Sequence, residues 1–109
     1  MMTEDELVAS VGRVEVTVLR RWVALGWIVP EPAASPPVFD EQDAARAQLI
    51  CDLVYDLAME DDSVPVVLSL LDQLHDARRL VRTMAAAIEA QPEDVRQRIA
   101  AALKGKGEA

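Results

Sequence analysis

The fold is decided by the stretch VTVLRRWVALGWIVPEPAASPPVFDEQD, residues 16–43. Val16, Leu19 and Val23 recur in it at helical spacing, which predicts an amphipathic helix with one buried stripe. Gly26 follows the last turn of that helix, where a left-handed cap favours a residue without a Cβ. The stretch therefore begins with a short helix that ends in a glycine cap.

Two short apolar pieces, Trp27–Val29 and Val38–Phe39, flank a loop that contains four prolines. Prolines exclude a helix from the loop, and we expect the two apolar pieces to form strand stubs. Trp27 then either seals this wing against the core or stays partly exposed as an anchor. Asp40 can cap the next helix, with Asp43 in its first turn. Helix, two-strand wing and helix together predict a winged helix-turn-helix.

Helices are expected on both sides of this stretch. Thr3–Glu6 has the spacing of a capping box, and Gly12 ends the first helix after about two turns. Two short helices around such a turn have helix-turn-helix geometry. The third helix is expected from Asp40 to about Met59. Its inner stripe consists of apolar residues at helical spacing: Ala47, Ile50, Val54 and Leu57.

Opposite that stripe, Asp52, Asp56 and Glu60 recur every four residues. Like charges at this spacing slightly disfavour a helix, so the row is either a tolerated solvated face or a contact for cations. Leu49 and Leu53 border the row and would supply apolar contact to a protein partner. On charge, these five residues are the candidate partner-binding site.

A long helix is predicted from Ser63 to about Ala90, with a heptad seam along it. The seam consists of Val67, Leu70, Leu74, Ala77, Val81, Met84 and Ile88. A narrow seam over about three heptads favours pairing with another helix, so we expect a homodimer. The predicted organisation is a winged helix-turn-helix over residues 1–62, a dimerisation segment over 63–104 with a short terminal helix, and a flexible tail over 105–109. The fold class is mainly all-α.

Composition restricts the possible functions. The formal net charge of −8 counts against duplex DNA as a partner, because Lys and Arg supply the affinity for phosphates. Cys51 is the only cysteine and cannot form an internal disulfide, which makes a reducing cytoplasm the default location. No phosphate loop, nucleophile motif or metal-ligand cluster is present, so we expect no enzymatic activity, cofactor or metal. No apolar run is long enough to predict a membrane span.

The second helix offers one candidate DNA-reading face. Thr17, Arg20 and Arg21 lie away from its apolar stripe, where a recognition helix would meet the major groove. The alternative is that the two arginines are simply solvated.

At this point the sequence resembles a family. LRRWVALGWIVP (residues 19–30), followed by VFDE (38–41), is similar to the winged helix of MerR-type proteins. The wing of their DNA-binding members carries arginine, and Glu31–Pro37 contains none. The chaperone-modulator, CbpM-like branch fits better, because it shares both of these segments and also the run VVLSLLD at residues 66–72. The resemblance covers residues 3–90.

This resemblance implies a small cytoplasmic protein that binds the J domain of a DnaJ-like co-chaperone and restrains its action with Hsp70. The alternative is a MerR-like transcription regulator that binds DNA as a dimer through its second helix and wing. The matched motifs do not identify individual contact residues in this sequence. The acidic row is therefore proposed as the partner-binding site on the basis of its charge alone.

Overall fold

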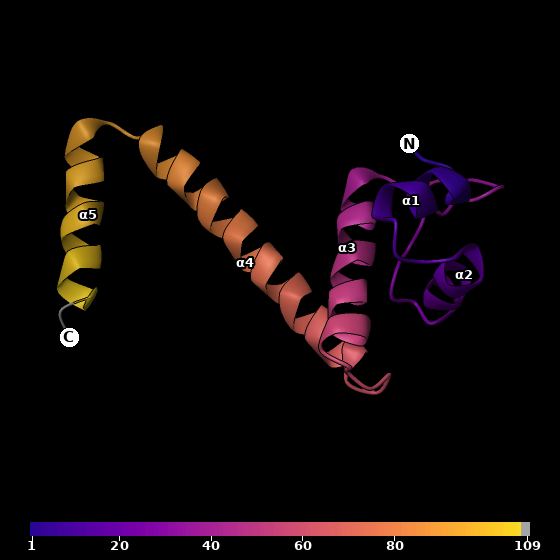
Figure 1. Cartoon of the computed structure of the whole chain (residues 1–109). Helices are drawn as coiled ribbons and strands as arrows, with labels where there is room; N and C mark the ends of the chain where they lie inside the picture. Colours follow the sequence, from indigo (N-terminus) through magenta and orange to yellow (C-terminus); the bar gives the residue numbers. More distant parts are fainter. Residues whose placement is uncertain (108–109) are drawn as a thin grey trace. The chain divides into compact units, whose positions relative to one another are not determined.

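The computed structural model describes residues 1–107, and these residues are mainly helical, as the sequence predicts. The helices are α1 (Glu4–Val11), α2 (Val16–Ala24), α3 (Glu41–Cys51), the π-helix η1 (Asp52–Asp56), α4 (Val64–Glu89) and α5 (Glu93–Gly107) (Figure 1). The chain divides into two compact units, residues 1–69 and residues 70–109. No helix among the described residues combines the length and apolar character that crossing a bilayer requires.

The ends of the first helices follow from local chemistry. In α1, the Thr3 hydroxyl accepts from the Glu6 amide at 3.2 Å, and the Glu6 carboxylate accepts from the Thr3 amide at 3.1 Å. This is the predicted capping box. Gly12 ends α1 with φ of 76°, a conformation that costs residues with a Cβ about 1–2 kcal/mol. Local sequence therefore suffices to define this helix.

Helix α2 ends in a Schellman motif. The Gly26 amide donates to the Val23 carbonyl at 3.0 Å, and the Trp27 amide donates to the Trp22 carbonyl at 2.9 Å. Gly26 has φ of 78°, so the predicted glycine cap is confirmed. At its start, α2 has Glu15 as N-cap without a side-chain hydrogen bond.

Asp40 caps α3, as predicted, and together with Asp43 it forms a second capping box. The Asp43 amide donates to the Asp40 carboxylate at 2.8 Å, and the Asp40 amide donates to the Asp43 carboxylate at 3.0 Å. Asp43 is half-buried, and desolvation by burial raises the pKa of its carboxyl.

The structure does not support the predicted two-strand wing. Phe39 pairs with Met2 in an isolated antiparallel bridge, and one backbone bond, from the Glu31 amide to the Val38 carbonyl at 3.1 Å, links the two arms of the loop. The prolines between the arms remove backbone donors that a ladder needs, so residues 27–39 form a closed loop without a named strand. Trp27 is buried. Of the two predicted alternatives, it therefore packs this loop against the core and is not an exposed anchor.

The core of the first unit brings together α1, α2, the loop, α3, η1 and the first turns of α4. Leu7, Leu19, Ile28, Ile50 and Val64 are completely buried. The full set of buried side chains is Leu7, Val11, Val14, Leu19, Trp22, Trp27, Ile28, Phe39, Ala47, Ile50, Cys51, Leu53, Val64 and Leu68. Because Val64 and Leu68 belong to it, this unit extends to Ser69 rather than ending at the predicted boundary of residue 62.

In the second unit, no side chain from residue 70 to residue 105 is fully buried. Along α4 beyond Ser69 and along α5, apolar side chains such as Leu80, Met84 and Leu103 are exposed. Half-buried side chains occur mainly near the break at Gln91–Pro92, at Ile88, Val95 and Ile99. Helix α5 continues to Gly107 and so includes residues 105–107 of the predicted tail. Residues 108 and 109, the rest of that predicted tail, lie outside the described residues.

Candidate functional site

The third helix departs from the predicted continuous α-helix at Asp52. There the backbone enters a π-turn, in which the Leu57 amide donates to the Asp52 carbonyl five residues earlier, at 3.0 Å. Ala58 follows with φ of 51° and ends the helical path before Met59. Short π-helical insertions of this kind are rare and frequently occur at functional sites.

Two leucines lie on the opposite side of the helix from the one that the sequence predicts. Leu57, predicted for the inner stripe, has 69% of its surface exposed, whereas Leu53, predicted at the partner-binding edge, is 6% exposed. Leu49, the other predicted edge residue, is half-buried and packs against the core. The prediction that Leu49 and Leu53 offer an apolar edge to a partner is therefore wrong for Leu53. The exposed apolar side chains at this place are Tyr55 and Leu57.

Two members of the acidic row contact a cation of the same chain. Asp52 and Asp56 are solvated, but both are ion-paired to Arg13, at 2.9 Å through Nη1 and at 2.7 Å through Nη2. The guanidinium also lies over the ring of Tyr55, with Cζ 5.8 Å from the ring centroid, within the range of a cation–π contact. The hydrogen bond to Asp56 raises the pKa of Arg13. Asp52 and Asp56 are therefore already occupied by a cation of the same chain.

Aromatic side chains connect this surface to the core. The ring of Trp22 lies 6.5 Å from that of Tyr55 and 6.4 Å from that of Trp27, centroid to centroid, distances typical of interacting aromatic pairs. Tyr55 is half exposed while both tryptophans are buried. The outer face of η1 is thus supported from beneath by rigid, buried rings.

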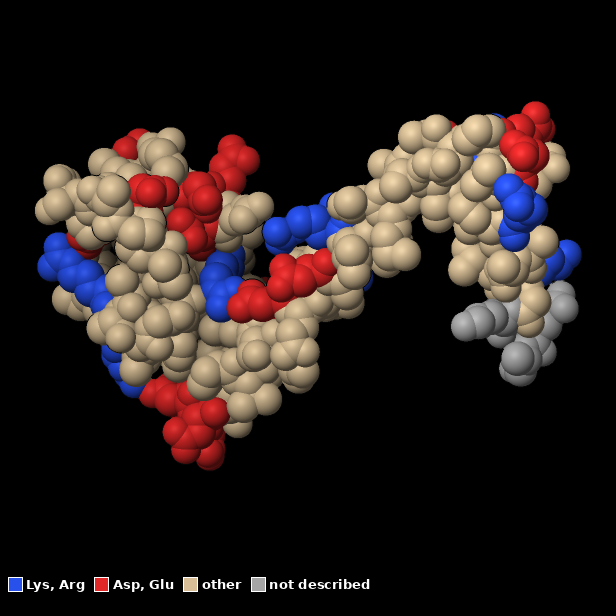
Figure 2. Space-filling view, turned by 180° about the vertical axis from the view of Figure 1, so that it is seen from behind, with Lys and Arg blue, Asp and Glu red and all other residues tan. Residues whose placement is uncertain are grey.

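The remaining acids gather on the loop between η1 and α4. Glu60, Asp61 and Asp62 are all exposed there, and Figure 2 shows acidic side chains clustered on this loop. Arg21 forms an ion pair with Asp61. Over residues 52–62, five carboxylates face two paired guanidinium groups, Arg13 and Arg21. An excess of negative charge beside Tyr55 and Leu57 remains available to a cationic partner.

The predicted DNA-reading residues Thr17, Arg20 and Arg21 are exposed on α2. Their charge is nevertheless compensated within the unit, because Arg20 donates to Glu4 at 2.8 Å and Arg21 pairs with Asp61. Phosphate binding would have to compete with both carboxylates. The arrangement weakens the alternative that α2 reads DNA.

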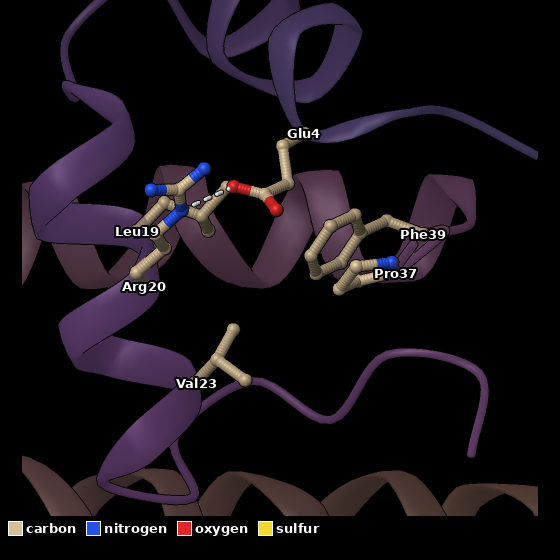
Figure 3. Close-up of a pocket in the computed structure, with 6 residues that line it drawn as sticks. All are labelled: Glu4, Leu19, Arg20, Val23, Pro37 and Phe39. Carbon is tan, nitrogen blue, oxygen red and sulfur yellow. Dashed lines mark hydrogen bonds and ion pairs between the residues drawn. The ribbon is translucent and has the colours of Figure 1, made fainter. Parts of the chain in front are cut away.

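A small cavity lies beside the Arg20–Glu4 ion pair (Figure 3). Its apolar lining comes from Leu19 and Val23 of α2 and from Pro37 and Phe39 of the loop. The volume is about 80 Å³, well below the roughly 300 Å³ at which small-molecule sites begin. The cavity has room for a few methyl groups and offers no evident small-molecule chemistry. Among residues 1–107, no three His, Cys, Asp or Glu side chains gather as a metal site would require.

The candidate dimerisation seam is exposed along most of its length. Leu70, Leu74, Val81 and Met84 are between 44% and 64% exposed. Only Val67 and Ile88 at its two ends are half-buried, and Ala77 in its middle is exposed. Helix α5 leaves these side chains accessible, so the seam has no partner within the described chain.

Sequence reasoning missed Arg13 and Tyr55 as parts of the acidic site. A signal for Arg13 existed, since two carboxylates four residues apart on a helix repel each other unless a cation lies between them. The π-turn that exposes Leu57 had no signal of comparable strength, because the apolar spacing fits an ordinary α-helix.

Comparisons of the chain with protein-family models, with curated proteins and with solved structures find no match.

Proposed function

We propose that this protein is a non-enzymatic, cytoplasmic modulator that binds the J domain of a DnaJ-like co-chaperone and restrains its action with Hsp70. The observation that carries the proposal is the surface formed by Tyr55, Leu57 and the loop acids Glu60, Asp61 and Asp62, which we call the η1 surface. It joins exposed apolar side chains to an excess of carboxylates. The resemblance of residues 3–90 to CbpM-like proteins supplies the identity of the partner.

Such a surface suits a basic amphipathic helix, the kind of element through which J domains engage Hsp70. Complementary charge mainly speeds and orients association, whereas buried aromatic and apolar side chains supply most of the affinity. Residues 1–69 carry 13 Asp and Glu against four Arg, a formal charge of −9, so the whole unit attracts a cationic helix. A helix held there would no longer be available to Hsp70.

The partner-binding residues of this proposal differ from the five that the sequence predicts. Glu60 remains in the partner-binding set as an exposed carboxylate. Asp52 and Asp56 contribute to the negative electrostatic potential of the surface, but both are ion-paired to Arg13. Leu53 is part of the core. Tyr55 and Leu57 take over the apolar contact that Leu49 and Leu53 were expected to make.

The competing function, a dimeric DNA-binding regulator, has the exposed Thr17, Arg20 and Arg21 in its favour. Against it stand the carboxylates that pair both arginines and the absence of arginine from Glu31–Pro37. We expect nonspecific duplex binding only, with Kd of about 10⁻⁴–10⁻⁶ M at physiological salt. A sequence-specific footprint at nanomolar protein would instead support the regulator.

The proposal includes self-association through α4. Leu70, Leu74, Val81 and Met84 form a narrow exposed row whose heptad spacing suits pairing with a second helix. A second copy of the chain presents a row of identical spacing, which is the simplest way to cover it.

Isothermal titration of the full-length protein with an isolated J domain tests the function. We expect saturable binding that weakens between 50 and 300 mM salt, because exposed charges are screened over about 8 Å at 0.15 M. Titration with a 30-base-pair duplex under the same conditions is the control and should give little heat. Saturable duplex binding without J-domain binding would overturn the proposal.

A further inference from the structure

The apolar pattern of residues 47–57 is compatible with two helical registers. In a continuous α-helix, Ala47, Ile50, Val54 and Leu57 share one face, and Leu57 would lie on the inner side. In the structure, Ala47 and Ile50 are buried and Val54 packs against the core, but Leu57 is exposed. One extra residue in a turn rotates the residues after it by about 100°, which accounts for the exposure of Leu57. The π-turn at Asp52–Asp56 therefore decides whether Leu57 is on the η1 surface.

We propose that Arg13 is a positioning residue that holds η1 in its π register and thereby keeps Tyr55 and Leu57 exposed for a cationic partner helix. Arg13 lies in the turn between α1 and α2, outside the helix that it holds. Its two terminal nitrogens bind the first and last residues of η1, Asp52 at 2.9 Å and Asp56 at 2.7 Å. One guanidinium thus spans the whole π-turn.

Electrostatics give this bridge its effect. Without a cation, the two carboxylates repel each other across one turn. With Arg13 between them, each oxygen accepts a charge-assisted hydrogen bond, and the fixed fork of the guanidinium favours one spacing of the two acceptors. The Cζ atom of the same group lies 5.8 Å from the Tyr55 ring centroid, and this cation–π contact helps to orient the aromatic part of the surface.

The choice of partner follows from charge. Residues 52–62 keep more carboxylates than guanidinium groups even after Arg13 and Arg21 are paired, so the exposed Tyr55 and Leu57 are surrounded by negative charge. A basic helix complements this surface, and an acidic or neutral one does not. This part of the inference rests on the proposed function, because the J domain is the partner assigned there.

Hydrogen exchange tests the role of Arg13 without any partner. The relevant amides are those of Leu57 and Met59, which donate to the Asp52 and Leu53 carbonyls at 3.0 and 2.9 Å. Arg13→Gln should accelerate their exchange about three- to thirty-fold, the range expected from losing two exposed ion pairs. Arg13→Lys keeps the charge but lacks the fork, so its exchange rates should lie between those of Arg13→Gln and the wild type.

Arg20→Gln is the matched control, because it also removes one arginine and its ion pair, with Glu4, but leaves η1 untouched. It should not change the exchange of Leu57 or Met59. If the amides of Leu57 and Met59 exchange as slowly in Arg13→Gln as in the wild type, Arg13 does not hold the π register. The same conclusion would follow if Arg20→Gln accelerated their exchange as much as Arg13→Gln does. A thermal melt of each variant separates local opening of η1 from loss of the fold.

Binding supplies the second readout. Arg13→Gln removes one positive charge and makes the net charge of the protein more negative by one. Charge alone should therefore strengthen its binding to a basic J domain. We expect weaker binding instead, by about fivefold or more, because the apolar contact becomes misplaced. Binding as tight as that of Arg20→Gln would overturn the positioning role. If the wild type binds no J domain, the proposed function fails, and the exchange rates alone still decide whether Arg13 holds the register.

Discussion

The two units of this chain use apolar residues in opposite ways. In residues 1–69, Leu7 of α1, Leu19 of α2 and Ile28 of the loop are completely buried. In residues 70–107, Leu74, Val81 and Met84 recur at heptad spacing and stay about half or more exposed. The charges differ as well, with −9 on residues 1–69 and +1 on residues 70–109.

The difference teaches that periodicity predicts which face is apolar, whereas burial depends on what covers that face. In the first unit, the loop and five helical elements meet around one cluster. In the second unit, a single long helix and α5 have too little apolar material to enclose each other. The seam is therefore the apolar row that stays exposed in the described part of the chain.

The largest effect should come from truncating the first core. Phe39→Ala removes a fully buried ring and should lower the free energy of unfolding by about 3–5 kcal/mol. Leu80→Ala, at an exposed position outside the seam, should change it by no more than about 0.5 kcal/mol. Urea denaturation followed by circular dichroism measures both. Equal losses in the two variants would mean that the second unit also has a core of its own.

Breaking the seam should have the next largest effect. Leu74→Lys with Val81→Lys places charges in the seam, and burying each of these apolar side chains is worth roughly 1.5–3 kcal/mol. Sedimentation should then show a monomer with the first unit still folded, because that unit ends at Ser69. Leu80→Lys is the control and should leave the dimer intact. A folded double mutant that still sediments as a dimer would contradict the role of the seam.

The two capping boxes should give small effects of opposite sign on acidification. The hydrogen bond from the Thr3 amide lowers the pKa of Glu6, so the stability that Glu6 contributes is lost as pH falls through its folded pKa. Burial raises the pKa of Asp43, so its protonation favours the folded state as pH falls through that higher value. Carboxyl NMR titration should find Asp43 above and Glu6 below their ordinary values. Asp43→Asn should remove the second effect alone, and an unchanged pH profile in that variant would refute the assignment.

The same contrast explains which features were predictable from sequence. Thr3, Gly12, Gly26 and Asp40 act on their immediate neighbours, so their caps could be predicted residue by residue. The wing could not, because its strand stubs would need each other, and Phe39 pairs with Met2 instead.

The candidate site was predictable only in part, for a similar reason. The sequence predicts the acidic row itself, but the availability of Asp52 and Asp56 depends on Arg13, 39 and 43 residues away in sequence. The exposure of Leu57 depends on a π-turn, which could not be predicted because the spacing of Ala47, Ile50, Val54 and Leu57 fits an ordinary α-helix. Contacts between distant segments determined both outcomes.

The central claim, that the acidic η1 surface recruits a basic J domain, is tested most directly by the association rate in stopped-flow measurements. Glu60→Lys with Asp62→Lys reverses two exposed charges on this surface. Glu15→Lys with Glu31→Lys changes the net charge equally at exposed positions elsewhere in the same unit. The account predicts association at least about tenfold slower for the first variant than for the second at low salt, with the difference shrinking as salt rises. Equal rates in the two variants would contradict it and place the J-domain contact elsewhere on the molecule.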